Sequence, residues 1–212
     1  MKCVILSGGT PPGLRLLKKH LETAGLFIGV DGAADFLIQY DMAPDVLIGD
    51  FDTADPASVS ALEQRGAKVL RLEPEKNETD TEAAIEYALK AGADDITILG
   101  ALGGRVDHTL SNIMMLVRAD RKGAACRITD EQCEMFVSDK TFILSGRPGQ
   151  VISILPLTGE VCVNAQGLKY PLQNLVLNWG SSRGISNVMQ KGAASISIAG
   201  GYALIVKNMI NT

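Results

Sequence analysis

The sequence predicts an α/β protein with an N-terminal doubly wound, mostly parallel sheet carrying helices on both faces, followed by a small all-β sandwich domain. Two observations predict this fold. In the first part, short apolar runs alternate with segments whose apolar residues recur every three or four positions, which favours a parallel sheet covered by helices. After about residue 130, short apolar segments are separated by Gly, Pro and Asn, and no helical period of useful length remains. We therefore expect two domains, 1–130 and 131–212.

The elements of the first domain are expected to alternate along the chain. Its strands are predicted at Cys3–Ser7, Leu26–Val30, Val46–Ile48, Lys68–Leu72, Ile96–Leu99 and Ala125–Thr129. Its helices are predicted at Leu14–Thr23, Ala33–Gln39, Ala57–Arg65, Thr81–Ala91 and Thr109–Arg121. The fourth helix has the clearest boundaries, because Thr79 and Glu82 fit a capping box and Gly92 supplies a stop.

The strands of the second domain are short and lie close together. They are predicted within CEMFV, KTFIL, QVISILPL, EVCVNA, LVLNW, SISIAG and YALIV, between residues 133 and 206. This spacing of strands and turn residues is typical of a small sandwich or barrel.

Composition excludes several classes of protein. With 46% hydrophobic residues the chain has ample material for a core, which argues against disorder. A net charge of −4 argues against non-specific binding of nucleic acid. The four cysteines form no C-x-x-C pair, and the opening apolar run is too short for a signal peptide or a membrane span. We therefore expect a cytoplasmic protein with reduced cysteines and no membrane partner.

Charged residues and glycine pairs follow the predicted strands one after another. Ligands bind beyond the carboxyl ends of the strands of an open parallel sheet, so these loops should meet at one edge. Five aspartates, a lysine, an arginine and two glycine pairs would converge there, namely Asp31, Asp50, Asp52, Asp80, Asp107, Lys76, Arg105, Gly8-Gly9 and Gly103-Gly104.

Most of these residues also have a purely structural explanation. Asp31, Asp80 and Asp107 each stand at a helix start, where a carboxylate caps free N–H groups and favours the helix dipole. The glycine pairs would serve equally well as tight turns. Lysine and arginine are commonly solvated surface charges, and His108, beside the cluster, is expected to be structural.

Asp50 and Asp52 are harder to explain structurally. No helix cap needs two carboxylates, and Asp55 before Pro56 already supplies a start for the next helix. A hard divalent cation such as Mg²⁺ takes one or two carboxylates and completes its shell with water and phosphate oxygens. Glycine-rich turns offer N–H donors to phosphates, and Arg105 and Lys76 can neutralise a transferring phosphoryl group. The sequence thus predicts a site for Mg²⁺ and a polyphosphate.

Two other functions remain open at this point. Asp50-Phe51-Asp52-Thr53 resembles the D-x-D-x-T nucleophile motif of haloacid-dehalogenase-type phosphatases, with Asp50 as the nucleophile. The late acidic motif of that family would then have to be Asp94-Asp95, which precedes a predicted strand and lies across the sheet from Asp50. A non-catalytic nucleotide-binding sensor is the third interpretation, but it would hardly need so many acidic residues.

Several motifs in order resemble the thiamine pyrophosphokinase (thiamine diphosphokinase) family over nearly the whole chain. They are VDGAADFL, PDVLIGDFDT, EKNETDTEAAIEYAL and LGALGGRVDHTLSN in the first domain, and GLKYPL and GISN in the second. The resemblance implies Mg²⁺-dependent transfer of the β,γ-pyrophosphoryl group of ATP to the hydroxyl of thiamine, giving thiamine diphosphate and AMP. It also implies a homodimer, with thiamine held between the α/β domain of one subunit and the sandwich of the other.

The resemblance further implies roles for individual residues. Asp50, Asp52 and Asp80 would hold Mg²⁺, Arg105 and Asp107 would contact the nucleotide, and Ser186 and Asn187 would lie near thiamine. Thr53, Asn77 and Ala33 depart from the usual Ser, acidic residue and Gly, and Asn77 weakens any metal role at its position.

A cationic thiazolium suits a pocket with a carboxylate and an aromatic face. Asp31 and Trp179 join Ser186 and Asn187 as candidates for such a pocket. However, an isolated tryptophan in a β domain is more often a core residue, and we expect Trp179 to be one.

Overall fold

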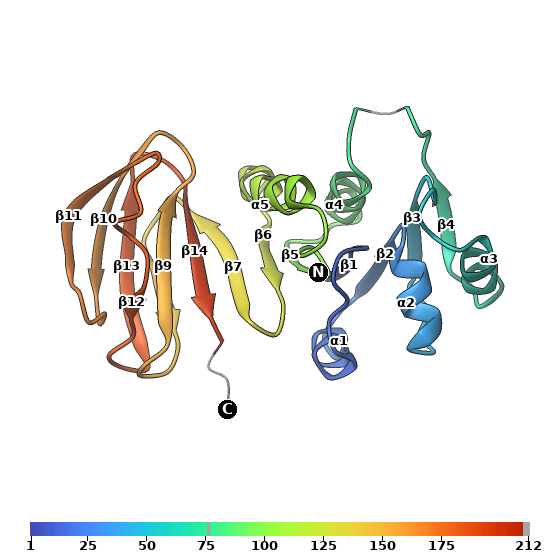
Figure 1. The fold of residues 1–212 in the computed structure, drawn as a ribbon, viewed down its shortest axis with the longest axis horizontal. Coiled ribbons are helices and arrows are strands. Elements are labelled where there is room, and N and C mark those ends of the chain that lie inside the picture. The colour runs from blue at the N-terminus through green and yellow to red at the C-terminus, as the bar shows by residue number, and fades with distance from the viewer. Residues whose placement is uncertain (76, 210–212) are drawn as a thin grey trace. The chain divides into compact units, whose positions relative to one another are not determined.

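The structure, a computed structural model, describes residues 1–75 and 77–209 and forms two compact units, Met1–Glu131 and Gln132–Thr212 (Figure 1). The α/β class and the sandwich that follows it are as the sequence predicts. Among the described residues, no helix is both long and apolar enough to cross a membrane.

The first unit is built on a parallel sheet of six strands. These are β1 (Lys2–Leu6), β2 (Leu26–Val30), β3 (Val46–Gly49), β4 (Lys68–Arg71), β5 (Asp95–Leu99) and β6 (Ala125–Thr129). They lie in the order β6-β5-β1-β2-β3-β4, and every neighbouring pair is parallel. The chain therefore runs outward from β1 to β4 and then returns to the other side of β1 with β5. The order of the sheet reverses between β1 and β5, and this is where ligands bind in such folds.

Five helices cover the two faces of this sheet. They are α1 (Leu14–Leu21), α2 (Ala33–Gln39), α3 (Pro56–Gln64), α4 (Asp80–Lys90) and α5 (Val106–Arg121). Right-handed crossovers place α1 to α3 on one face, and the reversal after β4 places α4 and α5 on the other (Figure 1). The core under α1 to α3 joins apolar residues of the sheet, such as Leu6 and Leu47, to Leu17, Leu37 and Leu62 of the helices. Residues 1–131 thus form a doubly wound fold with the predicted helices on both faces.

Capping follows the sequence at two of these helices. The Asp55 side chain accepts a hydrogen bond from the Ala57 N–H at 2.8 Å, with Pro56 at the first position of α3. At α4, Thr79 Oγ1 accepts from the Glu82 N–H at 3.2 Å. Asp31, Asp80 and Asp107 are not the N-caps, which are Gly32 at α2, Thr79 at α4 and Arg105 at α5. None of the three carboxylates is therefore an N-cap, but Asp80 and Asp107 lie in the first turn of a helix, where a carboxylate favours the helix dipole as expected.

The first turn of α5 is missed by the sequence pattern, which predicts a start at Thr109. The helix begins at Val106, whose side chain is 72% exposed. An exposed valine adds nothing to a buried apolar stripe, so periodicity gives no sign of a helix there.

The second unit is a sandwich of two antiparallel sheets. One has the order β12-β9-β14-β7 and the other β11-β10-β13-β8. The strands are β7 (Cys133–Ser138), β8 (Phe142–Ser145), β9 (Val151–Pro156), β10 (Glu160–Gln166), β11 (Leu172–Asn178), β12 (Asn187–Val188), β13 (Ala193–Ala199) and β14 (Ala203–Asn208). Among these strands of the described residues, the two-residue β12 is the one that is not predicted.

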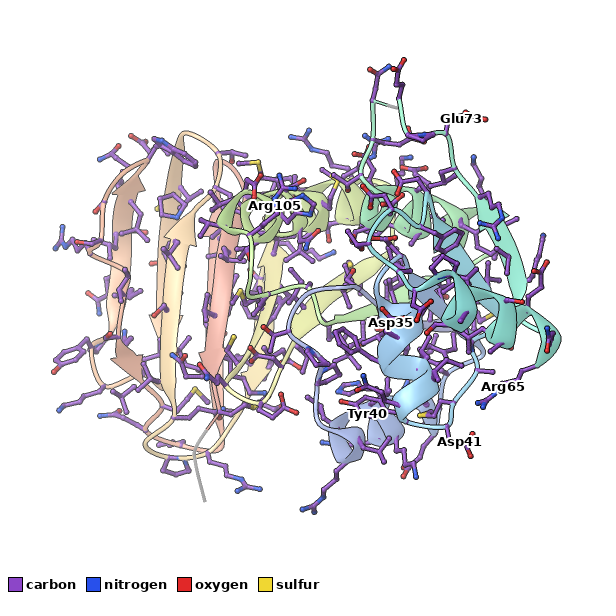
Figure 2. The ribbon with its side chains drawn as sticks, turned by 45° about the vertical axis from the view of Figure 1, so that its right-hand side comes forward. Asp35, Tyr40, Asp41, Arg65, Glu73 and Arg105 are labelled. Carbon is purple, nitrogen blue, oxygen red and sulfur yellow. The ribbon has the colours of Figure 1, made fainter. Side chains whose placement is uncertain are left out.

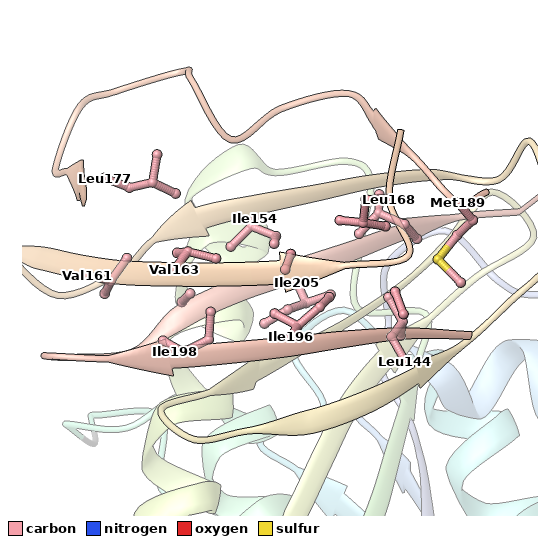
Figure 3. Packing of buried hydrophobic residues seen from close by; sticks show 14 residues of the cluster. Leu144, Ile154, Val161, Val163, Leu168, Leu177, Met189, Ile196, Ile198 and Ile205 are labelled. Atoms are coloured by element: carbon pink, nitrogen blue, oxygen red, sulfur yellow. The ribbon is translucent and has the colours of Figure 1, made fainter. Parts of the chain in front are cut away.

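Alternate residues of the two sheets fill the sandwich core. Figure 3 shows Ile154 and Ile205 from one sheet among Val163, Ile196 and Ile198 from the other, all of them buried. Trp179 is not part of this core, because its side chain is 64% exposed just beyond the end of β11. The prediction of a core tryptophan is wrong.

Candidate active site

The loops that leave β1 and β5 are joined to each other by their backbones. The N–H groups of Ser7, Gly9 and Thr10 donate to the carbonyls of Leu99, Gly100 and Leu102 at 2.8, 2.8 and 2.9 Å. A Cβ on Gly9 would lie 2.5 Å from the Gly100 carbonyl oxygen, so no larger residue fits without displacing the backbone. Glycine is required here for packing, and the Gly9 N–H is already engaged.

The β5 loop also depends on glycine for its conformation. Gly100, Gly103 and Gly104 have φ angles of 64°, 86° and 63°, in the left-handed region that other residues rarely adopt. This region turns the chain sharply between β5 and α5, and it brings Gly103 and Gly104 to the wall of a cavity.

That cavity, about 350 Å³ in volume, lies at the carboxyl ends of the strands around β1 and β5. It brings together seven of the residues predicted for the site: Gly8, Gly9, Asp31, Asp80, Gly103, Gly104 and Arg105. Asp50, Asp52 and Asp107 are not among its lining residues, and Lys76 lies outside the described residues. The volume is at the lower end of the range for small-molecule pockets.

Three carboxylates gather beside the cavity. Oxygen atoms of Asp31, Asp50 and Asp52 all lie within 4.8 Å of one another. The Asp31 N–H donates to the Ile48 carbonyl at 2.9 Å, so the parallel pairing of β2 and β3 brings Asp31 to this point. The family resemblance implies Asp80 as a metal ligand beside Asp50 and Asp52, whereas this cluster contains Asp31, and Asp80 lines the cavity.

The cluster has the properties of a cation site. Asp31 Oδ1 is buried and has no hydrogen-bond partner in the described structure, while Oδ2 accepts from the Thr53 hydroxyl. A buried carboxylate oxygen without a donor is costly unless a cation or a proton joins it. Carboxylate oxygens are also the ligands that Mg²⁺ prefers. The residues present therefore fit a hard divalent cation.

Phe51, the residue between the two neighbouring aspartates, adopts a left-handed conformation with φ of 59°. A bulky residue seldom does so, and such strain is concentrated at functional sites. Its ring packs against the core and lies 5.2 Å from the Arg71 guanidinium, which holds the turn. Asp50 Oδ1 also accepts from the Asp52 N–H at 3.3 Å, and the two carboxylates remain together on the same side.

Arg105 and Asp107 form an ion pair at the beginning of α5, where Figure 2 labels Arg105. The guanidinium donates through two nitrogens to the two carboxylate oxygens, at 3.2 and 2.6 Å. This hydrogen-bonded arginine holds the pKa of Asp107 at about 2, below its ordinary value of 3.8. Both side chains are exposed, so the fork of Arg105 is accessible to a competing phosphate. With so low a pKa, Asp107 is a poor general base near neutral pH.

Several cavity residues were not predicted from the sequence. Ser7 and Thr81 are buried, and their hydroxyl oxygens lie 2.9 Å apart. His108, expected to be structural, lines the cavity together with Asn112, four residues further along α5. The side chain of Asn112 is buried, and Nδ2 donates to the Ala101 carbonyl at 2.8 Å. The spacing of four between His108 and Asn112 was the one sequence signal for a shared helix face.

In the second unit, Ser186 and Asn187 precede and begin β12. Ser186 is exposed, has φ of 62°, and its N–H donates to Ser153 Oγ at 3.1 Å. Asn187 is buried, and its side-chain amide forms hydrogen bonds with both the N–H and the carbonyl of Tyr170. Nδ2 donates to the Tyr170 carbonyl at 2.7 Å, and Oδ1 accepts from the Tyr170 N–H at 3.0 Å. Asn187 therefore braces the 168–170 segment, and the exposed Ser186 is the better placed of the two for contact with a ligand.

The acidic residues that a phosphatase would need lie at the wrong end of the sheet. Asp94 and Asp95 stand at the amino end of β5, where Asp94 pairs with the N-terminal amine at 2.7 Å and Asp95 with Arg127 at 3.0 Å. Asp50 follows β3 at its carboxyl end. The strands are parallel, so the two acidic groups are separated by the length of a strand.

Two family models match the chain. The one described as "Thiamin pyrophosphokinase, catalytic domain" matches residues 17–128, and "Thiamin pyrophosphokinase, vitamin B1 binding domain" matches residues 141–202. The chain belongs to the thiamin pyrophosphokinase family. Members of this family are transferases, and thiamine and ATP are their substrates. Neither the phosphatase nor the sensor interpretation is supported by these matches.

Individual relatives resemble the chain over its full length. Thiamine pyrophosphokinase of Bacillus subtilis (strain 168) is 28% identical over 207 residues, which cover 96% of this chain and 97% of the relative. A crystal structure of thiamine pyrophosphokinase from Bacillus subtilis has a TM-score of 0.87 at 26% identity and covers all of both chains. The structure of thiamin pyrophosphokinase from Geobacillus thermodenitrificans has a TM-score of 0.86 at 27% identity, covering 100% of this chain and 99% of that one.

Proposed function

We propose that this member of the family is a Mg²⁺-dependent thiamine diphosphokinase. In the proposed reaction the hydroxyl oxygen of thiamine attacks the β-phosphorus of ATP, the bond from that phosphorus to the α,β-bridging oxygen breaks, and AMP leaves. The hydroxyl proton passes to a base. The observation that carries this proposal is the cluster of Asp31, Asp50 and Asp52 beside a glycine-lined cavity, in a chain that matches both family models.

Asp50 and Asp52 are proposed to hold Mg²⁺, as the doubled carboxylate in the sequence indicates. The position of Asp31 in the cluster, and its buried oxygen without a donor, support adding it to this set. Asp80 stays in the proposed set because it lines the adjoining cavity. A bound Mg²⁺ supplies charge neutralisation and orientation of phosphate oxygens.

The nucleotide is proposed to bind in the cavity between the β1 and β5 loops. Gly8, Gly103 and Gly104 let a phosphate chain approach the backbone closely, which favours a role in binding ATP. Arg105 is proposed to exchange Asp107 for phosphate oxygens and to stabilise charge that moves toward the departing AMP. In the absence of nucleotide, Asp107 would hold the Arg105 guanidinium in position.

The second unit is proposed to bind thiamine. The match of residues 141–202 to a vitamin B1 binding domain supports this assignment. Ser186 and Trp179 are both exposed, and an aromatic face suits a cationic thiazolium. Asn187 is proposed to act indirectly, because its amide is engaged with Tyr170.

A homodimer that shares its sites between subunits is the proposed assembly, and the reduced cysteines predicted from the sequence make the cytoplasm the proposed location. The side chains of Val106, Leu110 and Met114 recur every four residues on α5 and are exposed, which supports an interface on this helix.

Mixing inactive Asp52→Asn with an inactive Ser186→Trp variant tests the shared site. After subunit exchange, about a quarter of wild-type activity should return, since half the dimers are mixed and each keeps one intact site. No recovery, despite proven exchange, would restrict each site to one subunit.

The catalytic proposal itself is tested by measuring AMP formation from ATP and Mg²⁺ with and without thiamine. AMP should appear only when thiamine is present, in equal amount to thiamine diphosphate. Release of phosphate from a phosphomonoester without thiamine would support the phosphatase instead.

A further inference from the structure

Asn112 is the one buried polar side chain on α5 within the described structure, and its neighbours on the same face are Leu116 and Ala119. A buried amide carries a desolvation cost that an apolar residue would not, and this cost is offset only if the amide is hydrogen-bonded. Nδ2 donates to the carbonyl of Ala101, which is itself buried and lines the cavity. The amide therefore acts on the β5 loop.

The carbonyl groups of this loop are hydrogen-bonded one after another. Those of Leu99, Gly100 and Leu102 accept from N–H groups of residues 7, 9 and 10 in the β1 loop. The carbonyl of Ala101 falls between them and accepts from Asn112 instead. Four consecutive carbonyl oxygens, each carrying partial negative charge, are thus covered by donors, and two of these residues, Gly100 and Ala101, line the cavity.

Covered carbonyls matter for an anionic ligand. A carbonyl oxygen that turns toward a phosphate repels it, and a peptide flip at Ala101 would also reorient the N–H of Leu102. The loop is rich in glycine, with φ above +60° at Gly100, Gly103 and Gly104, and such residues resist a flip poorly. A fixed side-chain donor at Ala101 prevents it.

We propose that Asn112 is a positioning residue that keeps the β5 loop in its phosphate-accepting conformation by capping the Ala101 carbonyl. This inference rests on the proposed binding of ATP in this cavity. Its ligand class is the phosphate chain of the nucleotide, and the adenosine part is not affected by Asn112.

The test compares binding of adenosine, AMP, ADP and ATP, each with Mg²⁺, by calorimetry. Asn112→Leu removes the donor, keeps the branched shape of the side chain and adds no charge, whereas aspartate would itself repel phosphate. We expect ATP to bind about tenfold more weakly or worse, the scale of one lost buried hydrogen bond, and adenosine to change by less than about twofold. Leu116→Val is the matched control, since it alters the same buried face one turn further along without touching the loop, and it should leave the series unchanged.

A second measurement separates positioning from direct contact with nucleotide. In the nucleotide-free protein, amide hydrogen exchange in residues 100–104 should become faster in Asn112→Leu and remain unchanged in Leu116→Val. If Asn112→Leu does not fold, Asn112→Ser, whose hydroxyl is too short to reach Ala101, takes its place with the same expected results.

Equal weakening of adenosine and ATP, unchanged ATP affinity, or unchanged exchange in the loop would each overturn the positioning role. A wild-type protein that binds the nucleotides but forms no AMP with thiamine would refute the proposed reaction and leave this test intact. A wild-type protein that binds none of them would overturn both.

Discussion

Replacing Asp52 by asparagine should stabilise the metal-free protein while it damages the enzyme. The carboxylate oxygens of Asp31, Asp50 and Asp52 lie within 4.8 Å of one another. At that separation and a water-like dielectric, suited to the exposed Asp52, each pair of charges repels by about 0.9 kcal/mol. Losing two such pairs should stabilise the protein by about 1 to 2 kcal/mol, less whatever salt screens. For a chain of this size that is a rise in Tm of about 2 to 8 °C in EDTA.

In Mg²⁺ the wild-type protein, rather than Asp52→Asn, should have the higher Tm. Wild-type protein should gain Tm on adding Mg²⁺, because a ligand that binds only the folded state stabilises it. Asp52→Asn should gain much less, and its turnover should fall by about a hundredfold or more, the scale of losing a key charge-stabilising group. Differential scanning calorimetry in EDTA and in Mg²⁺, together with steady-state kinetics, measures all three quantities.

A matched control removes the same formal charge elsewhere. Asp139→Asn alters an exposed aspartate in the turn after β7 and should change neither the response to Mg²⁺ nor turnover. A lower Tm of Asp52→Asn in EDTA would show that the three charges do not repel one another. Near wild-type turnover with the same Mg²⁺ dependence would remove Asp52 from the metal site.

Three further outcomes are expected. Arg105→Lys should reduce turnover nearly as much as Arg105→Ala does, because an ammonium cannot present two parallel donors to two phosphate oxygens. Wild-type kinetics in the lysine variant would show that Arg105 is a surface residue without a role in turnover. Gly9→Ala should lower the free energy of unfolding by about 1 to 3 kcal/mol or more, because the added Cβ would lie 2.5 Å from the Gly100 carbonyl oxygen. Thermal unfolding measures the effect, and an unchanged Tm would contradict that contact. Asp107 should titrate near pH 2 in carboxyl NMR of the nucleotide-free protein and nearer its ordinary 3.8 in Arg105→Ala. Because the folded pKa is lowered, the pair stabilises the protein above the ordinary pKa and loses that contribution as the pH falls toward 2, and a wild-type midpoint near 3.8 would refute the pairing.

Periodicity predicts the fold of this chain well because each element repeats its burial pattern. The parallel strands are continuous apolar runs such as Val46–Gly49, and the sandwich strands alternate as in Glu160–Gln166. Where burial does not follow a period, the sequence pattern does not predict the element. Val106 is exposed, so the first turn of α5 goes unseen, and β12 is too short to carry a pattern and exists through its pairing with β9.

The candidate site divides in the same way. Strand order alone brings the Asp31, Asp50 and Gly103 loops to one edge, because the carboxyl ends of parallel strands coincide. Which carboxylates then meet depends on the register of the strands, and the pairing of β2 with β3 brings Asp31 to Asp50. The sequence does not reveal the contact of Asn112 with Ala101 or that of Ser7 with Thr81, because such residue types are common and the contacting residues are separated along the chain.

The most direct test of the account is to find which phosphorus atom is attacked. ATP carrying ¹⁸O in the α,β-bridging position is incubated with Mg²⁺ and thiamine, and the products are analysed by mass spectrometry. Attack at the β-phosphorus leaves the bridging oxygen on the departing nucleotide, so the account predicts labelled AMP and unlabelled thiamine diphosphate. Formation of ADP with thiamine monophosphate, or label in the thiamine product, would contradict it.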